Sequence, residues 1–543
     1  MKNTVYFFLF IFFCTNGVAQ PNKNIVPKKP VLIVIITVDN MGTDNLLRYW
    51  NNFSDKGFKR LASEGAYFPY ACYPFLQYQH SQAYASLSTG TTPAGHGIIA
   101  DKWYDNVKDK MFGAVVDDQV KPIGINRYAA SGSHSPVNLL PATFSDELKM
   151  RSFNKAKVIG VGMEPEAAIL PTGHIVDAAY WFDDETANWI SSTFYMDSLP
   201  AWVREFNKKT LEDTYLDGEW VPYIDLKNYR GSFMDNNSME TGFGGQITFP
   251  YNLRNLKSKF KYRLLKSIPW GNTYTLDFAI AAIINEKLGE DTITDYLSIN
   301  LSASKNINKL FGQYSMEMED LYVRLDMDVA HLLEMLDDRF IKSNVLVLLT
   351  SSGMYARQPT YLEKQRIPAG YFRPAQAMHL AKLFLKASYG ESELIKHYYN
   401  RNIYFDRKLL DEKKIDLFQL QNKTASFLLQ MTGIMYALPG HTLTNNSFSE
   451  GIIAQLQRAY NPSRSGDIVL ILEPGWAEMN YIESIETATG NVPLFFYGWK
   501  TKNAYFNTEI VYITDIAGTL AHMLFITKPP LASSGIIPAF TGK

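Results

Sequence analysis

The strongest constraint on the fold is an unbroken apolar run, VLIVIITVD, which spans Val31–Asp39 and ends in a carboxylate. A β-branched run without polar alternation is typical of a strand buried on both faces, as in a parallel sheet covered by helices. The carboxyl edge of such a sheet is where α/β folds bind their ligands. We therefore expect Asp39 to lie at a ligand-binding edge.

Further short apolar runs end in polar or glycine-containing tips, and amphipathic helices separate some of them. These runs are Lys157–Met163, Tyr296–Ser302, Val345–Ser352, Asp467–Pro474 and Val492–Gly498. Helices are predicted where leucines and Val329 recur at helical spacing between Leu321 and Leu336, and over Phe278–Leu288 with Gly289 as the cap. This alternation predicts an α/β fold with a mostly parallel central sheet flanked by helices.

The first twenty residues predict a secretory signal peptide, residues 1–20, followed by a short leader, residues 21–30. Lys2 precedes the apolar stretch Val5–Phe13, and Gly17–Ala19 supplies the small residues of a cleavage site. About nine apolar residues cannot span a bilayer, which needs roughly 20. We therefore expect an exported protein without a transmembrane segment in the mature chain, in the periplasm or on the outer surface of a Gram-negative bacterium.

The remaining residues, 31–543, are expected to form one domain with two inserted cap segments, about 175–275 and about 354–450. Both segments interrupt the alternation of strands and helices. The formal net charge of −1 gives no support for nucleic-acid binding. The aromatic content of 14% suits a secreted protein associated with carbohydrate or a surface, but it does not decide the function.

Several sequence blocks, in a fixed order, carry a family resemblance. They are FKRLASEGAYFPYACYP (Phe58–Pro74), STGTTPAGHGIIADKWYD (Ser88–Asp105), AAILPTGHIVDAAYWF (Ala167–Phe182), TLDFAIAAIINEKLGE (Thr275–Glu290) and YITDIAGTLAHML (Tyr512–Leu524). Together they resemble the alkaline phosphatase superfamily, in particular the secreted two-zinc phosphatases of Bacteroidetes, near the nucleotide pyrophosphatase/phosphodiesterases. The resemblance implies two zinc ions held by carboxylates and imidazoles, a Thr or Ser nucleophile, and amide and basic side chains that hold the phosphoryl oxygens.

By this resemblance, the positions that would bind and attack phosphate carry other residue types. The nucleophile falls at His80, and Ser81 could replace it if the turn slipped by one residue. The phosphate-holding amide falls at Asp101, and a Lys-x-Arg pair is replaced by Glu164 and Glu166. The two glutamates could form a new metal or cation site, or they could be loop acids that face solvent.

The implied zinc ligands are lost in the same way, and only Asp39 is retained. An Asp-x-x-x-His pair is replaced by Lys305 and Lys309, whose ammonium groups offer no lone pair while charged. An adjacent Asp-His pair is replaced by Ser351 and Ser352, and the segment that should supply the last histidine contains none. We expect Lys305 or Lys309 to pair with Asp39 or with the acids near it.

The sequence therefore leaves three hypotheses. The first is a pseudoenzyme without catalytic residues or zinc, which acts as a binding or scaffold component for an unknown protein partner in the cell envelope. The second is an active phosphatase or phosphodiesterase with a non-standard site around Asp39, His80, Ser81 and Asp101. The third is a small-molecule receptor that prefers cations, because Asp101, Glu164 and Glu166 are acidic.

Overall fold

The computed structural model describes residues 29–76, 79–126, 128–479, 487–488 and 490–541. The predicted signal peptide, and the leader up to residue 28, lie outside the described residues. Within the described part of the chain, no helix has both the length and the apolar character needed to cross a membrane.

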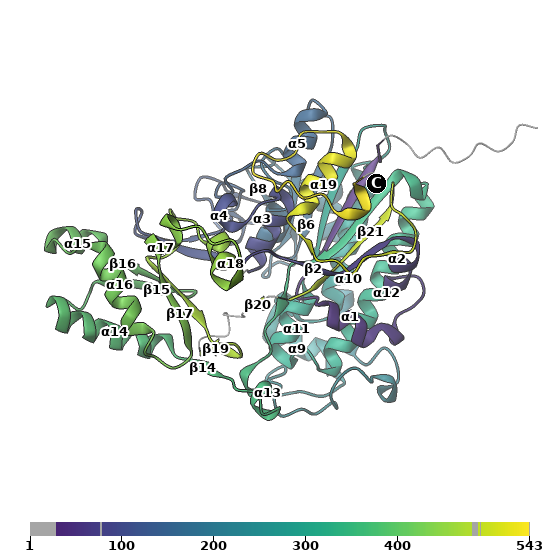
Figure 1. Ribbon diagram of the computed structural model, residues 1–543. Coiled ribbons are helices and arrows are strands. Elements are labelled where there is room, and N and C mark those ends of the chain that lie inside the picture. Colours follow the sequence, from purple (N-terminus) through teal and green to yellow (C-terminus); the bar gives the residue numbers. More distant parts are fainter. Residues whose placement is uncertain (1–28, 77–78, 127, 480–486, 489, 542–543) are drawn as a thin grey trace, which may run out of the picture.

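A large sheet forms the centre of the molecule (Figure 1). Its strands, in spatial order, are β22 (Tyr505–Phe506), β2 (Ala66–Cys72), β21 (Val492–Gly498), β12 (Val345–Ser351), β1 (Leu32–Val38), β11 (Asp295–Leu301), β6 (Val158–Gly162), β7 (Ala178–Phe182), β8 (Trp189–Ser192) and β5 (Pro122–Ile123), with β23 (Val511–Tyr512) beside β2. The strands from β12 to β7 run parallel, while β21 and β8 run antiparallel to their neighbours. The predicted α/β fold with a mostly parallel central sheet is confirmed.

Helices cover both faces of this sheet, which explains why β1 is apolar throughout. One face packs against α1 (Thr43–Tyr49), α2 (Phe58–Glu64), α10 (Trp270–Asn285) and α12 (Met316–Arg339), and the other against α3 (His80–Thr89), α5 (Phe144–Arg151) and α19 (Asp515–Leu524). Alternate residues of β1 enter the two cores: Leu32 and Val34 lie in the first, and Ile33 and Ile35 in the second. Burying each such side chain contributes about 1.5–3 kcal/mol.

Both predicted helices are present, and their ends follow local chemistry. The stripe from Leu321 to Leu336 is buried in α12, which begins after Ser315, whose side chain accepts a hydrogen bond from the Met318 backbone N–H (3.1 Å). Helix α10 begins eight residues before the predicted start and ends at Asn285. Gly289 lies beyond its end with φ +73°, a conformation that favours glycine.

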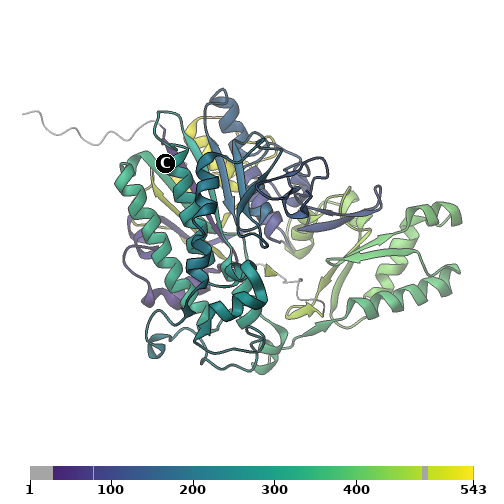
Figure 2. The same ribbon diagram turned by 180° about the vertical axis from the view of Figure 1, so that it is seen from behind.

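A smaller unit projects from the main body (Figures 1 and 2). It contains the strands β15 (Ile395–Tyr399), β16 (Asn402–Phe405), β17 (Ile434–Pro439) and β18 (Ile468–Leu472), and the helices α14 (Pro374–Tyr389), α15 (Arg407–Lys413), α16 (Leu417–Leu428), α17 (Gly440–Asn445) and α18 (Gly451–Ala459). The run Asp467–Pro474, which the sequence grouped with the central strands, forms β18 in this sheet instead. Residues of β18 enter two cores, one on each face, so burial alone could not tell which sheet the run joins.

The predicted cap boundaries remain predictions. The segment about 175–275 contributes β7 and β8 to the central sheet before it forms α7 (Ala201–Lys208), α8 (Leu211–Leu216) and α9 (Leu253–Phe260). The segment about 354–450 begins with β13 (Met354–Tyr355) and α13 (Pro359–Lys364) and continues into the projecting unit.

Candidate functional site

The register of the parallel strands brings the predicted positions together at one edge. Val38, the last residue of β1, pairs with Leu301 of β11 and with Ser351 of β12. The residues beside these pairs, Asn300 and Ser352, therefore flank Asp39. All three side chains are fully buried.

One oxygen of the Asp39 carboxylate is held by neutral donors. Asp39 Oδ1 accepts hydrogen bonds from the Tyr84 hydroxyl (2.6 Å), the Ser352 hydroxyl (2.6 Å) and the Asn300 amide (2.9 Å). Its second oxygen, Oδ2, has no hydrogen-bond partner among the described residues. The acid retained at the strand end is thus bound by the protein's own side chains.

His80, the first residue of α3, joins this arrangement through Ser352. His80 Nδ1 lies 2.8 Å from the Ser352 hydroxyl and 3.7 Å from Asp39 Oδ1. Because Ser352 gives its single proton to Asp39, Nδ1 must be the donor to Ser352. Burial lowers the pKa of His80, and the nearby Lys305 and Lys309 lower it further against the opposing effect of Asp39. The imidazole is therefore uncharged at neutral pH.

Ser81 lies beside Asp101 but is not set up as a nucleophile. Its backbone N–H donates to Asp101 Oδ1 (3.0 Å), and the Asp101 N–H donates to Gln79 Oε1 (3.0 Å). Burial would raise the pKa of Asp101, but Lys305, His80, and the side chain and N–H of Ser81 outweigh burial and hold the pKa below its usual range. The buried Ser81 hydroxyl therefore lies near the Asp101 carboxylate, although it makes no well-formed hydrogen bond within the described chain. A carboxylate whose pKa is held low is a weak general base, so Asp101 is poorly suited to activate Ser81.

The two glutamates differ in how their charges are balanced. Glu164 precedes α6 (Pro165–Ile169), and its carboxylate lies 3.2 Å from the ammonium of the buried Lys266, which also contacts Asp184 (2.8 Å). Burial would raise the pKa of Glu164, but Lys266 and Lys305 outweigh burial and lower it. Burial, with Glu164 as the next cause, raises the pKa of Glu166 to about 7.

Positive charge replaces the implied ligands on α11 (Ala303–Phe311). Lys305 and Lys309 are four residues apart and share one helix face. Lys305 lowers the pKa of Asp101 and of Glu164. The predicted pairing of a lysine with the acids near Asp39 is thus present electrostatically for Lys305, whereas the closest ammonium to Glu164 that we observe belongs to Lys266.

The remaining ligand positions have structural contacts, and the donor set does not fit a zinc pair. Ser351 accepts a hydrogen bond from the Met41 N–H (3.0 Å) and donates to the Gly353 carbonyl (2.7 Å). Among the described residues, no group of three or more His, Cys, Asp or Glu side chains could hold a metal ion. Zinc sites in proteins use three or four such ligands gathered on one ion, and Asp39, whose Oδ1 is already bound by Tyr84, Asn300 and Ser352, lies in no such group.

Sequence reasoning missed three residues of this site. Tyr84 lies one helical turn after His80, and Asn300 is a polar residue inside an apolar run, so both gave a weak signal. Lys266 gave none, because its pairing with Glu164 depends on long-range folding.

A family model and several known proteins match this chain over most of its length. A family model described as type I phosphodiesterase / nucleotide pyrophosphatase matches residues 33–491. Alkaline phosphatase PafA of Elizabethkingia meningoseptica is 33% identical over 522 residues, which cover 95% of each chain. Alkaline phosphatase PhoV of Synechococcus elongatus is 32% identical over 549 residues, which cover 96% of each.

Solved structures show the same likeness. The crystal structure of wild-type PafA matches with a TM-score of 0.90 at 32% identity, covering 95% of this chain and 100% of that one. A PafA variant with one threonine, one asparagine, one lysine and one arginine substituted matches with a TM-score of 0.89 at 32% identity, covering 95% and 99%.

Proposed function

Because the chain belongs to the type I phosphodiesterase/nucleotide pyrophosphatase family, and its relatives include alkaline phosphatases, we propose that it is an exported pseudoenzyme. It keeps the fold of a phosphoesterase without the zinc ligands, the nucleophile or the phosphate-binding groups. The observation that carries the proposal is the environment of Asp39, whose Oδ1 accepts hydrogen bonds from Tyr84, Asn300 and Ser352 where a metal ion is implied.

The spacing of the altered positions supports this proposal. In the PafA variant, the substituted threonine and asparagine are 21 residues apart, and the lysine and arginine are two apart. The same spacings separate His80 from Asp101 and Glu164 from Glu166. On this matching, a hydroxyl is replaced by an imidazole, an amide by a carboxylate, and two cations by two carboxylates.

The electrostatics oppose binding of a phosphate ester. A unit negative charge about 4 Å from a phosphoryl oxygen costs about 4 kcal/mol at an effective dielectric constant near 20. Asp101 and Glu164 keep pKa values below their usual ranges and are ionised at neutral pH. Lys266 and Lys305 offset part of this repulsion, but Lys266 is already shared between Glu164 and Asp184.

We assign the protein a binding or scaffold role in the cell envelope, in the periplasm or on the outer surface. The support is the predicted signal peptide, together with a fold that keeps complete cores on both faces of the central sheet. Affinity purification of the chain from its native envelope is expected to recover a protein partner in stoichiometric amount. Recovery of the chain alone, after crosslinking, would remove the scaffold role.

A cation receptor is the second candidate, and Glu166 favours it. Lys305 attracts the Glu166 carboxylate, but burial and the negative charges of Glu164 and Asp101 outweigh it and raise the pKa of Glu166 to about 7. A rise in melting temperature with alkylamines, but not with inorganic phosphate, would favour this role over a scaffold.

Ester hydrolysis tests the pseudoenzyme directly. The mature chain, incubated with zinc, is expected to hydrolyse neither p-nitrophenyl phosphate nor bis(p-nitrophenyl) phosphate above the rate of the chain-free buffer. Turnover that is lost in Ser81→Ala or His80→Ala, and kept in Ser86→Ala on the same helix, would establish the active hydrolase instead.

A further inference from the structure

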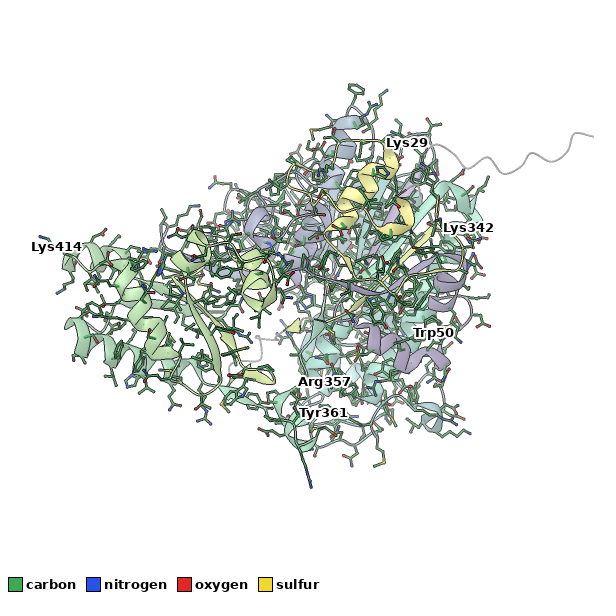
Figure 3. All side chains as sticks on the ribbon, in the orientation of Figure 1. Lys29, Trp50, Lys342, Arg357, Tyr361 and Lys414 are labelled. Atoms are coloured by element: carbon green, nitrogen blue, oxygen red, sulfur yellow. The ribbon has the colours of Figure 1, made fainter. Side chains whose placement is uncertain are left out.

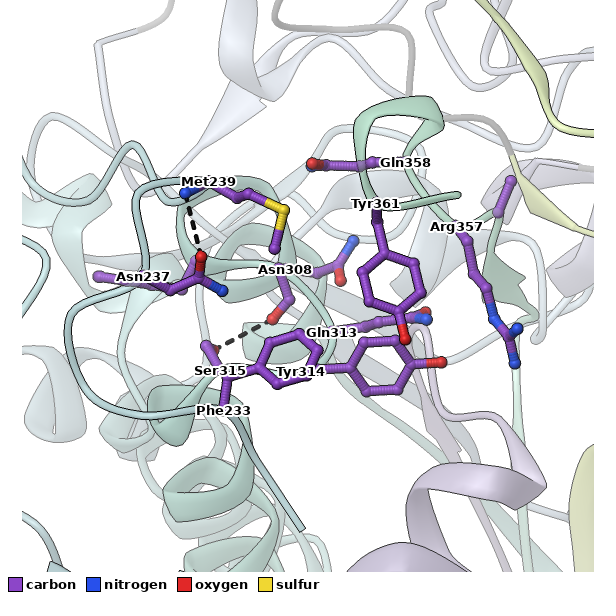
Figure 4. Close-up of a pocket in the computed structure, with 13 residues that line it drawn as sticks. Phe233, Asn237, Met239, Asn308, Gln313, Tyr314, Ser315, Arg357, Gln358 and Tyr361 are labelled. Carbon is purple, nitrogen blue, oxygen red and sulfur yellow. Dashed lines mark hydrogen bonds between the residues drawn. The ribbon is translucent and has the colours of Figure 1, made fainter. Parts of the chain in front are cut away.

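A small cavity of about 50 Å³ lies beside α11, between the loop that contains Phe233 and helix α13, and a larger, more open hollow of about 600 Å³ adjoins it. We call it the Tyr361 pocket, and we define it by the residues Phe233, Asn308, Gln313, Tyr314, Gln358 and Tyr361, which line it together with seven others (Figure 4). Figure 3 places Tyr361 and Arg357 together at the lower edge of the main body, away from Lys414 in the projecting unit. Alone, the cavity is smaller than the range of about 300–1,000 Å³ typical of small-molecule sites, but the adjoining hollow, which shares four of its lining residues, falls within that range.

Three aromatic rings form an apolar wall of the pocket. The Tyr314 ring centroid lies 5.3 Å from that of Tyr361 and 5.6 Å from that of Phe233, and the Phe233 and Tyr361 centroids are 5.9 Å apart. The Arg48 guanidinium lies 4.3 Å from the Tyr314 ring centroid and holds that ring in place. Because Tyr314 is only 5% exposed, the wall is well fixed by its surroundings.

One amide of the pocket is open to a ligand. Asn308 is only 8% exposed, and its side chain makes no hydrogen bond with any described residue. In Figure 4 its carboxamide points into the space bordered by Met239, Gln358 and Tyr361. Its amide atoms are not among the buried polar atoms that lack a partner, so they reach solvent and are available to a ligand in the pocket.

Four other polar side chains of the pocket are also open to a ligand. The side chains of Gln313 and Gln358 and the hydroxyls of Tyr314 and Tyr361 also make no hydrogen bonds with the described part of the chain. Amides and phenols both donate and accept. Arg357 is the single charged side chain among the thirteen that line the cavity. Such a lining suits a neutral ligand with many hydroxyl groups, because each hydroxyl also donates and accepts.

We propose that the Tyr361 pocket binds a neutral oligosaccharide. The C–H faces of a pyranose ring are apolar and complement the negative faces of aromatic rings, while its hydroxyl edge matches the unpaired amides. The pocket shares Phe233, Asn237, Met239 and Tyr361 with the more open hollow of about 600 Å³, which gives room for more than one sugar ring. A peptide is a poorer match, because backbone pairing needs an exposed strand edge, and these walls come from α11, α13 and loops.

This site is distinct from the residues around Asp39, and the proposal does not depend on whether the chain hydrolyses esters. The test is calorimetric titration of the mature chain with maltotriose, cellotriose and triacetylchitotriose, together with a printed array of neutral glycans. We expect at least one to bind with a Kd between about 10 μM and 1 mM.

Matched variants tie that binding to the pocket. Tyr361→Ala and Asn308→Ala are each expected to weaken binding about tenfold or more, and Gln358→Ala, an exposed position that cannot impair folding, several-fold. Tyr512→Ala and Asn285→Ala, at exposed positions elsewhere, and Ser81→Ala in the Asp39 region, are expected to leave it unchanged.

Three results would overturn the proposal. They are the absence of binding to every neutral glycan tested at 10 mM, binding that Gln358→Ala and Tyr361→Ala both leave unchanged, and preferential binding of extended peptides over all the sugars. None of them bears on the hydrolysis assays, so failure here and failure of the pseudoenzyme proposal are separable.

Discussion

The polar groups around Asp39 and those of the Tyr361 pocket differ in whether they are hydrogen-bonded within the protein, although helix α11 contributes to both regions. Around Asp39, buried charges and hydroxyls are mostly bound to one another, as in the contacts of Tyr84 and Ser352 with the carboxylate. In the Tyr361 pocket, the Asn308 amide makes no hydrogen bond with a described residue and is not among the buried polar atoms without a partner, so it reaches solvent. The contrast indicates that the strand edge has become a structural element, whereas the pocket retains free binding capacity.

The largest expected effect concerns Lys266, whose loss would break the charge balance around Glu164. Lys266→Met leaves Glu164 and Asp184 without their cation, and we expect the free energy of unfolding to fall by about 2–4 kcal/mol. Lys261→Met is the control, because its partner Glu185 is exposed and such a pair contributes about 0–1 kcal/mol. Urea unfolding of both variants measures the difference, and equal losses would contradict the account.

Two tyrosines sharpen the comparison directly. Tyr84→Phe removes a donor to the buried Asp39 carboxylate and should lower the free energy of unfolding by about 1.5–3 kcal/mol. Tyr361→Phe removes a hydroxyl that has no partner among the described residues, so we expect a change of less than about 0.5 kcal/mol. If urea unfolding gave the two substitutions the same cost, the distinction between the regions would fail.

Glu166 makes the stability of the region around Asp39 depend on pH. Its pKa is raised to about 7 in the folded chain, so the carboxyl lowers stability increasingly as the pH rises from about 4.5 to 7. Glu166→Gln should therefore stabilise the fold by about 1–3 kcal/mol at pH 8 and have little effect at pH 4.

Glu164→Gln is the matched control and should have the opposite sign. Because Lys266 and Lys305 lower the pKa of Glu164, its charge contributes stability that is present above the unfolded pKa and is lost in acid. Unfolding measured at pH 4 and pH 8 tests both variants. A Glu166→Gln variant that is destabilised at pH 8 would show that the carboxylate has a cationic partner.

The smallest expected effect is at Ser81. Its buried hydroxyl lacks a partner among the described residues, so Ser81→Ala should leave stability unchanged or raise it by up to about 1 kcal/mol. Ser86→Ala, which removes a hydroxyl 2.9 Å from His96 Nε2, should lower it by about 1 kcal/mol. Chemical denaturation that reversed this order would show that Ser81 has a structural or functional partner.

The central sheet could be predicted well because the residues of β1 by themselves indicate a buried parallel strand. A run buried on both faces must be apolar throughout, and the acid at its end marks the carboxyl edge. The same reasoning misplaced β18, because a run buried on both faces of the projecting sheet has the same pattern. Which neighbour a strand pairs with is decided by long-range contacts that a local pattern does not contain.

For the site, the sequence located the positions but not their partners. The retained Asp39 and the altered positions His80 and Ser352 do meet at one edge. The donors Tyr84 and Asn300 were missed because a tyrosine in a helix and an asparagine in a strand have many ordinary roles. The Lys266 pair was missed because its members come from separate elements, and only the folded chain brings them together.

Zinc binding tests the central claim most directly. The mature chain would be equilibrated with micromolar zinc, dialysed, and analysed for metal by mass spectrometry, with Asp39→Asn in parallel. The account predicts less than about 0.1 zinc per chain in both proteins, because Asp39 stands without the further ligands that zinc requires. Two zinc ions per chain in the natural protein, lost in Asp39→Asn, would contradict it.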